Sequence, residues 1–133
     1  MTATASRPIV LVIEDEPLIV RVIEESVSDL PIEMLSAADG ISGLRMVKEH
    51  MPALVLLDLA LPGIDGWEIL ADIRNTPETE SMPVVIVTAH GDTVLEAESR
   101  TRGANGFVSK PFRPSDLREI IYRYLPTDMA EAV

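Results

Sequence analysis

Three short, uninterrupted apolar runs constrain the fold most, because each has the length of one β-strand and stops at a polar residue. They are residues 8–13 (PIVLVI), 53–57 (ALVLL) and 83–87 (PVVIV). A strand with one face in water alternates apolar and polar residues, whereas a continuous apolar run is typical of a strand buried on both faces. We therefore expect a parallel sheet that helices cover on both sides.

The segments around these runs predict two further strands and five helices. The further strands are residues 33–37 and 106–109. The expected helices are residues 18–30, 41–47, 67–73, 92–102 and 117–125. Pro17 suits a first helical turn and Asp39 suits a helix cap. Five strands that alternate with five helices imply one α/β domain with right-handed crossovers between parallel strands.

The composition excludes several classes of function. The chain carries 11 basic and 22 acidic residues, a formal net charge of −11, so direct DNA binding is disfavoured. It has no cysteine, which excludes disulfides and thiolate zinc sites, so any metal is expected to bind to oxygen. No apolar run approaches ~20 residues and no signal-peptide pattern opens the chain. We expect a cytoplasmic protein that has no membrane segment.

Polar side chains stand where four of the predicted strands end. Glu14 and Asp15 follow the first run, Asp58 the second, Thr88 the third, and Lys110 the last strand. Ligands of open parallel sheets bind at the carboxyl ends of the strands, which share one edge. Three carboxylates gathered there would repel one another unless a divalent cation joined them, and oxygen ligands in an incomplete cage suit Mg²⁺.

A carboxylate beside Mg²⁺ can attack a phosphorus atom and form an aspartyl phosphate. Asp58 fits the role of nucleophile, Lys110 that of the neutralising cation, and Thr88 that of a nearby hydroxyl. Each residue alone is more often a helix cap or an ordinary surface residue. Their joint placement on successive strand ends indicates a site.

With these residues the chain resembles the receiver domain of two-component response regulators. The resemblance is carried by Glu14-Asp15, Asp58-Leu-Ala-Leu-Pro-Gly-Ile-Asp-Gly66, Thr88-Ala89 and Lys110-Pro111-Phe112. It spans about residues 7–125 and implies a flavodoxin-like (βα)5 three-layer sandwich with strand order 2-1-3-4-5. A disordered segment, residues 1–6, and a short tail, residues 126–133, are expected outside this domain.

The resemblance also assigns roles in phosphoryl transfer. Asp58 would be the phosphoacceptor, and Asp15, Asp58 and the backbone carbonyl of Ala60 would bind Mg²⁺ or Mn²⁺. Glu14 would act mainly through a metal-bound water, and Lys110 would pair with Asp58 or with the phosphoryl oxygens. The chain would catalyse its own phosphorylation and dephosphorylation and no other reaction.

By the same resemblance, Thr88 and Phe107 form a switch. Thr88 would turn its hydroxyl toward the phosphoryl group, and Phe107 would rotate inward. The bond between Lys110 and Pro111 resembles one that is cis in the family, although the trans form stays open. The chain departs from the commonest pattern at Glu14, at Phe107 and at Ala60 with His90, which leaves the dephosphorylation rate open.

The expected partners are a histidine kinase or histidine phosphotransfer protein as donor, and a downstream protein as target. The target would bind the face formed by residues 92–102, 106–109 and 117–125, and a phosphorylation-dependent homodimer stays open. The helix at residues 92–102 has few core-facing side chains, so we expect it to rearrange easily. No output domain is evident after residue 126, so we expect a stand-alone regulator or phosphorelay intermediate, unless the chain is a fragment.

Two alternatives compete with this interpretation. A phosphatase of the haloacid dehalogenase type also uses an aspartyl nucleophile and Mg²⁺, but that family has a second Asp where this chain has Ala60. A receiver-like interaction module that is never phosphorylated usually lacks the acceptor Asp or the Lys, and both are present here. His50 and His90 follow no kinase or phosphotransfer signature, so we assign them no catalytic role.

Overall fold

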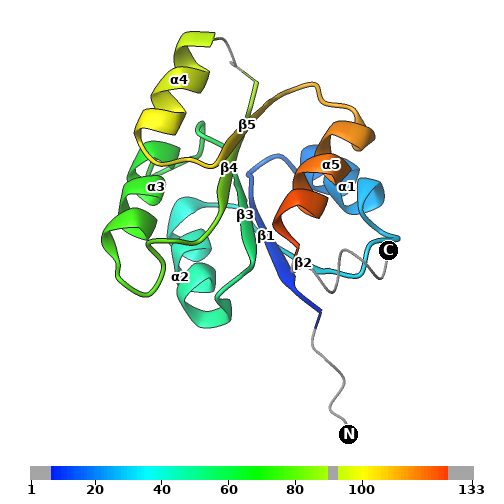
Figure 1. The fold of residues 1–133 in the computed structure, drawn as a ribbon, viewed down its shortest axis with the longest axis horizontal. Coiled ribbons are helices and arrows are strands. Elements are labelled where there is room, and N and C mark those ends of the chain that lie inside the picture. Colours follow the sequence, from blue (N-terminus) through cyan, green and yellow to red (C-terminus); the bar gives the residue numbers. More distant parts are fainter. Residues whose placement is uncertain (1–6, 90–92, 126–133) are drawn as a thin grey trace, which may run out of the picture.

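Five parallel strands form one sheet in the order β2-β1-β3-β4-β5 in the computed structural model, which describes residues 7–89 and 93–125. The strands are β1 (Ile9–Ile13), β2 (Glu33–Ala37), β3 (Leu54–Leu57), β4 (Val84–Thr88) and β5 (Gly106–Ser109). The helices are α1 (Pro17–Ser26), α2 (Gly40–His50), α3 (Gly66–Asn75), α4 (Thr93–Thr101) and α5 (Pro114–Tyr124). Helices α1 and α5 cover one face, and α2, α3 and α4 cover the other (Figure 1). The predicted flavodoxin-like order and its three layers are confirmed.

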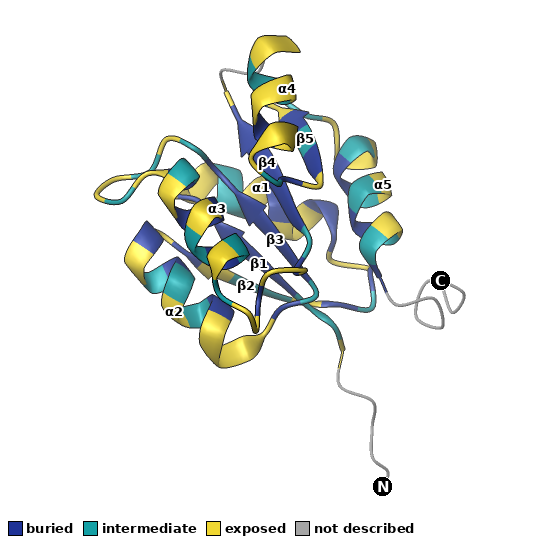
Figure 2. Cartoon of the chain, turned by 60° about the vertical axis from the view of Figure 1, so that its left-hand side comes forward, coloured by how far each residue is buried: buried dark blue, intermediate teal, exposed yellow. Residues whose placement is uncertain are grey.

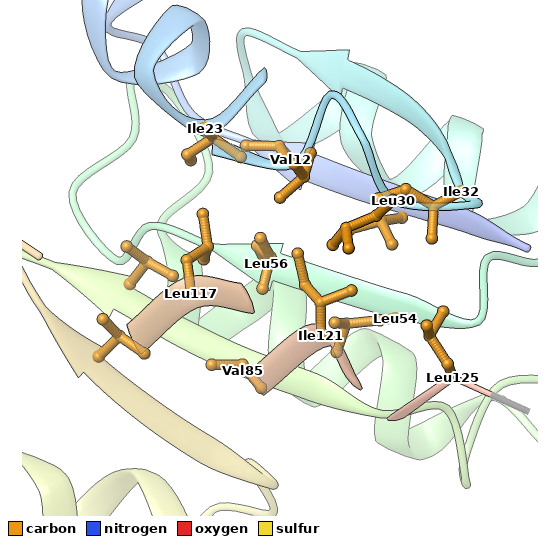
Figure 3. Close-up of a cluster of buried hydrophobic side chains, with 14 residues drawn as sticks. Val12, Ile23, Leu30, Ile32, Leu54, Leu56, Val85, Leu117, Ile121 and Leu125 are labelled. Carbon is orange, nitrogen blue, oxygen red and sulfur yellow. The ribbon is translucent and has the colours of Figure 1, made fainter. Parts of the chain in front are cut away.

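The uninterrupted apolar runs are explained by two separate cores. Successive residues of a strand point to opposite faces, so Val10 and Val12 join the cluster under α1 and α5, while Leu11 and Ile13 join the cluster under α2 and α3. Figure 3 shows the first cluster, in which Leu117 and Ile121 of α5 face Leu56 of β3. Burying one such side chain contributes about 1.5–3 kcal/mol, so both layers stabilise the sheet.

The predicted helix at residues 18–30 is too long. Helix α1 ends at Ser26, whose hydroxyl donates to the carbonyl of Val22 at 2.6 Å. Val27 and Leu30 lie in the turn that follows, yet both remain buried in the α1/α5 cluster. The apolar spacing therefore continued past the end of the helix, because the turn returns its side chains to the same core.

The remaining helix ends are set by local sequence. Pro17 begins α1, and the Asp39 side chain accepts a hydrogen bond from the backbone N–H of Ser42 at 2.8 Å, so both predicted N-terminal signals are confirmed. Within the described residues, α4 begins at Thr93, and the predicted start at Asp92 falls outside them. Residues 1–6 and 126–133 also lie outside, so the predicted domain boundaries stay a prediction. In the part of the chain described, no helix is both long and apolar enough to cross a membrane.

Candidate functional site

Three carboxylates meet at the edge of the sheet where β1 and β3 end. One oxygen each of Glu14, Asp15 and Asp58 lies within 4.8 Å of the others. The backbone N–H of Asp58 donates to the carbonyl of Ile13 at 3.0 Å, so the sheet fixes the spacing of these residues. Glu14 and Asp58 are only 3% and 4% exposed, whereas Asp15 is exposed to solvent. The predicted acidic cluster is therefore present, with two buried members and one accessible member.

The ammonium group of Lys110 lies among these carboxylates. Its Nζ is 2.5 Å from Glu14 Oε1 and 3.3 Å from Asp58 Oδ2. The backbone N–H of Lys110 donates to the carbonyl of Thr88 at 2.8 Å, and the Lys110–Pro111 bond is cis, as the resemblance implies. The structure thus brings Lys110 to Asp58, as predicted, and also gives it a shorter contact with Glu14.

Burial and neighbouring charges shift the pKa values of both Glu14 and Lys110. Desolvation by burial raises the pKa of Glu14 to about 7, although the hydrogen bonds from Lys110 and from the Glu16 N–H act in the opposite direction. Burial alone would lower the pKa of Lys110, but its contacts with Glu14 and Asp58 raise that pKa above its ordinary value. One ammonium facing three carboxylates leaves a local excess of negative charge, which would favour a bound cation.

The loop after β3 fixes the orientation of the Asp58 carboxylate. The backbone N–H of Ala60 donates to Asp58 Oδ1 at 3.1 Å, which leaves Oδ2 on the side of Lys110. Gly66 closes this loop, and its N–H donates to the carbonyl of Leu59 at 3.1 Å. A Cβ atom at position 66 would come 2.8 Å from the carbonyl oxygen of Asp58 and 2.6 Å from Cα of Leu59. Only glycine fits there without moving the backbone.

The two predicted switch residues lie on neighbouring strands. Thr88 ends β4, is 1% exposed, and pairs in register with Ser109 of β5. Phe107 is half-buried and packs against the α2/α3 cluster. It also lines a cavity of about 360 Å³ between β5 and α5, together with Val108, Ser109, Asp116, Glu119 and Ile120.

Two features of the site were not predicted from the sequence. Glu16 Oε1 lies 3.8 Å from Lys110 Nζ, and the Glu16 backbone N–H donates to Glu14 Oε2 at 3.1 Å. The steric requirement at Gly66 was also missed, because an Asp-Gly pair is equally typical of an ordinary turn. Of the two histidines, His50 is exposed at the end of α2, and His90 lies outside the described residues.

Known proteins share both the sequence pattern and the fold. The family model described as the response regulator receiver domain matches residues 10–122. Response regulator Rre1 from Synechocystis sp. is 31% identical over 125 residues, which cover 92% of this chain and 53% of that protein. Sporulation initiation phosphotransferase F from Bacillus subtilis is 33% identical over 117 residues, which cover 88% of this chain and 93% of that protein.

A solved structure extends the comparison to a metal-bound relative. The receiver domain of sensor histidine kinase PA1611 from Pseudomonas aeruginosa PAO1, which has a magnesium ion coordinated in its active site cleft, matches with a TM-score of 0.80 and 28% identity. The match covers 90% of this chain and 98% of that domain. The chain spans only 41% to 53% of the length of four curated relatives that it matches. On its fold, its family match and these relatives, the chain belongs to the family of response regulator receiver domains.

Proposed function

We propose that Asp58 accepts a phosphoryl group from a phosphohistidine and that this modification switches a protein-binding face. The observation that carries the proposal is the placement of one buried carboxylate, Asp58, within 4.8 Å of Glu14 and Asp15 and 3.3 Å from Lys110 Nζ. A nucleophile flanked by a metal-binding cluster and a cation is what phosphoryl transfer to a carboxylate requires. The donor would be a histidine kinase or a histidine phosphotransfer protein.

The residues present fit a divalent cation. All three side chains of the cluster offer oxygen, and Asp15 is open to solvent, which suits an ion that keeps several waters. We infer that Asp15, Asp58 and the carbonyl of Ala60 hold Mg²⁺ or Mn²⁺, with Glu14 acting through a water. When bound, such an ion would neutralise charge on the phosphoryl oxygens.

The residues of the chain itself would perform the transfer in one displacement. Because the Ala60 N–H holds Asp58 Oδ1, the nucleophile is Oδ2. A bond forms between Oδ2 and phosphorus while the bond from phosphorus to the donor imidazole nitrogen breaks, and the electron pair leaves with the imidazole. Lys110 then balances the transferred charge, and the buried hydroxyl of Thr88 donates to a phosphoryl oxygen.

The signal would leave the domain through the face formed by α4, β5 and α5. This face contains the cavity of about 360 Å³ beside Phe107, and inward rotation of Phe107 would change its shape. A downstream protein or a second phosphorylated copy of the chain would bind there. We place the chain in the cytoplasm with its kinase, and we assign it no reaction beyond its own phosphorylation and dephosphorylation.

Intact-protein mass spectrometry after incubation with acetyl phosphate and Mg²⁺ tests the proposal. We expect a gain of one phosphoryl mass that EDTA abolishes and that Asp58→Asn lacks. Asp72→Asn on α3 is the matched control, since it makes the same exchange outside the acidic cluster and leaves the nucleophile and the proposed metal ligands in place. A folded chain that binds Mg²⁺ and gains no mass would refute the proposal and favour an interaction module that is never phosphorylated.

A further inference from the structure

Helix α4 is held in place differently from the helix beside it. Ser99 is its one buried residue, and among the described residues neither apolar cluster contains a side chain from α4. In contrast, α3 contributes Ile69, Leu70 and Ile73 to the α2/α3 cluster. Figure 2 shows the same difference, because α4 is coloured largely as exposed while the strands beneath it are buried. Apolar packing therefore does little to fix the position of α4.

The segment that follows α4 is bound firmly to the rest of the domain. The Arg74 guanidinium, at the end of α3, donates from Nε to the carbonyl of Gly103 at 2.9 Å and from Nη2 to Asn105 Oδ1 at 2.8 Å. Asn105 Oδ1 also accepts from the backbone N–H of Val84 at 2.8 Å. Gly103 itself has a φ of +104°, which ends the helix in a conformation that L residues rarely adopt. Residues 103–105 thus form a fixed point at one end of α4.

One aromatic contact joins the turn directly after α4 to α3, next to this fixed point. The Arg102 guanidinium lies 4.6 Å from the centroid of the Trp67 ring. Glu98, one helical turn earlier, accepts hydrogen bonds from Arg102 Nε at 3.0 Å and from Nη2 at 2.8 Å, so it orients the guanidinium over the ring. Trp67 in turn packs against the α2/α3 cluster. The contact therefore connects a loosely packed helix to a firmly packed one.

We propose that Arg102 on Trp67 is a latch that holds α4 against α3, and that α4 turns about residues 103–105 when the latch opens. A cation–π contact at an exposed site changes the ratio of the packed to the turned position of α4 by roughly two- to fivefold. A bound partner can therefore shift the helix easily. The latch is inferred for the unphosphorylated chain, and this inference does not depend on whether Asp58 is a phosphoacceptor.

Two arginines near the end of α4 make the latch testable, Arg100 in the helix and Arg102 in the turn that follows it. Arg100 pairs with Glu96 and Arg102 pairs with Glu98 at the same spacing, and their side chains are 58% and 49% exposed. Only Arg102 stacks on a ring among the described residues. Arg102→Ala and Arg100→Ala each remove one exposed ion pair, and Arg102→Ala also removes a second hydrogen bond to Glu98 and the aromatic contact.

The experiment is amide hydrogen exchange of the unphosphorylated chain, read by mass spectrometry on peptides from α4 and β5. Arg102→Ala should speed exchange in α4 roughly two- to fivefold relative to Arg100→Ala, while peptides covering residues 103–109 stay protected. In a Trp67→Leu background the two alanine variants should behave alike. Equal exchange in the two variants with Trp67 present would overturn the latch, and faster exchange in residues 103–109 together with α4 would overturn the fixed point.

Fluorescence gives a second measurement, because Trp67 is the only tryptophan of the chain. Acrylamide should quench Trp67 more strongly in Arg102→Ala than in the unmutated chain, since the guanidinium no longer covers the ring. Arg100→Ala should leave quenching unchanged. Equal quenching in all three proteins would show that Arg102 does not cover Trp67 in solution.

Discussion

Replacing Arg74 with lysine should destabilise the domain more than the same exchange at an exposed arginine such as Arg123. The Arg74 guanidinium donates four hydrogen bonds, to the carbonyl oxygens of Gly103, Glu80 and Met82 and to the side chain of Asn105. Burial lowers the pKa of Arg74 below its ordinary value, but the group stays charged. Lysine keeps the charge and loses the planar fork that reaches these acceptors together.

The magnitude follows from the bonds that lysine cannot make. A hydrogen bond to a charged group contributes about 1.5–3 kcal/mol when it is shielded from water. The bonds to Glu80 and Asn105 are exposed, and an ammonium can retain one of the two part-buried bonds, so one shielded bond is lost. Because water can partly replace it at this half-buried position, we expect the free energy of unfolding to fall by about 1–2 kcal/mol.

Urea denaturation measures this loss, provided that the slope of the transition does not change. Arg123→Lys is the control, since Arg123 makes one exposed pair with Glu119 at 3.5 Å, and it should cost less than about 0.5 kcal/mol. A fall of less than about 0.5 kcal/mol for Arg74→Lys, no larger than that of the control, would show that water satisfies the freed carbonyl equally well. The role of Arg74 in fixing residues 103–105 would then be refuted as well.

Three further predictions concern the site and one helix end. Because the folded chain raises the pKa of Glu14 from 4.5 to about 7, the stability that its protonation provides is complete below about pH 4.5 and is lost as pH rises through 7. In EDTA, the free energy of unfolding of Glu14→Gln should therefore rise by about 1–3 kcal/mol relative to that of the unmutated chain as the pH increases from 5 to 8. A difference between the two proteins that does not change with pH would contradict this. Gly66→Ala places a Cβ atom against the Asp58 carbonyl, so it should lower the free energy of unfolding by about 1–3 kcal/mol. It should also slow phosphoryl uptake in the mass assay. Normal uptake would show that the loop accommodates the Cβ without displacing Asp58. Asp39→Ala should cost about 1 kcal/mol in urea, while Asp39→Asn, which can still cap α2, should cost less.

The fold class was predictable because the apolar pattern of the strands indicates it with little help from the helices. Each of the three buried runs has the length of one strand and ends at a polar residue, so the sheet type, three of its five strands and the position of the carboxyl edge follow from local sequence. Glu14, Asp15 and Asp58 were predictable as a cluster for the same reason, since parallel strands place their ends side by side. The strand order came from the family resemblance, because apolar spacing does not reveal which strands are neighbours.

The side-chain contacts between distant segments could not be predicted. Arg74 looks in sequence like an ordinary basic residue at a helix end, where it would complement the helix dipole, yet two of its acceptors are 29 and 31 positions away. Trp67 is a half-buried residue of α3, and its contact with Arg102 depends on how the end of α4 lies against α3. Such contacts follow from the assembled fold and leave no periodic trace in the sequence.

The connection between the site and α4 follows from the contrast between rigid strands and a loose helix. Thr88 ends β4, and its carbonyl accepts the backbone N–H of Lys110 at 2.8 Å, so both site residues are tied to the buried pair of strands β4 and β5. Shifting these strands would expose apolar surface at a cost of about 25 cal/mol per Å². The exposed contact of Arg102 with Trp67, which movement of α4 would break, is worth about 0.5–1 kcal/mol. A change at Thr88 is therefore expected to be relieved by α4 and not by the sheet, which makes the unphosphorylated domain easy to switch and its core insensitive to the switch.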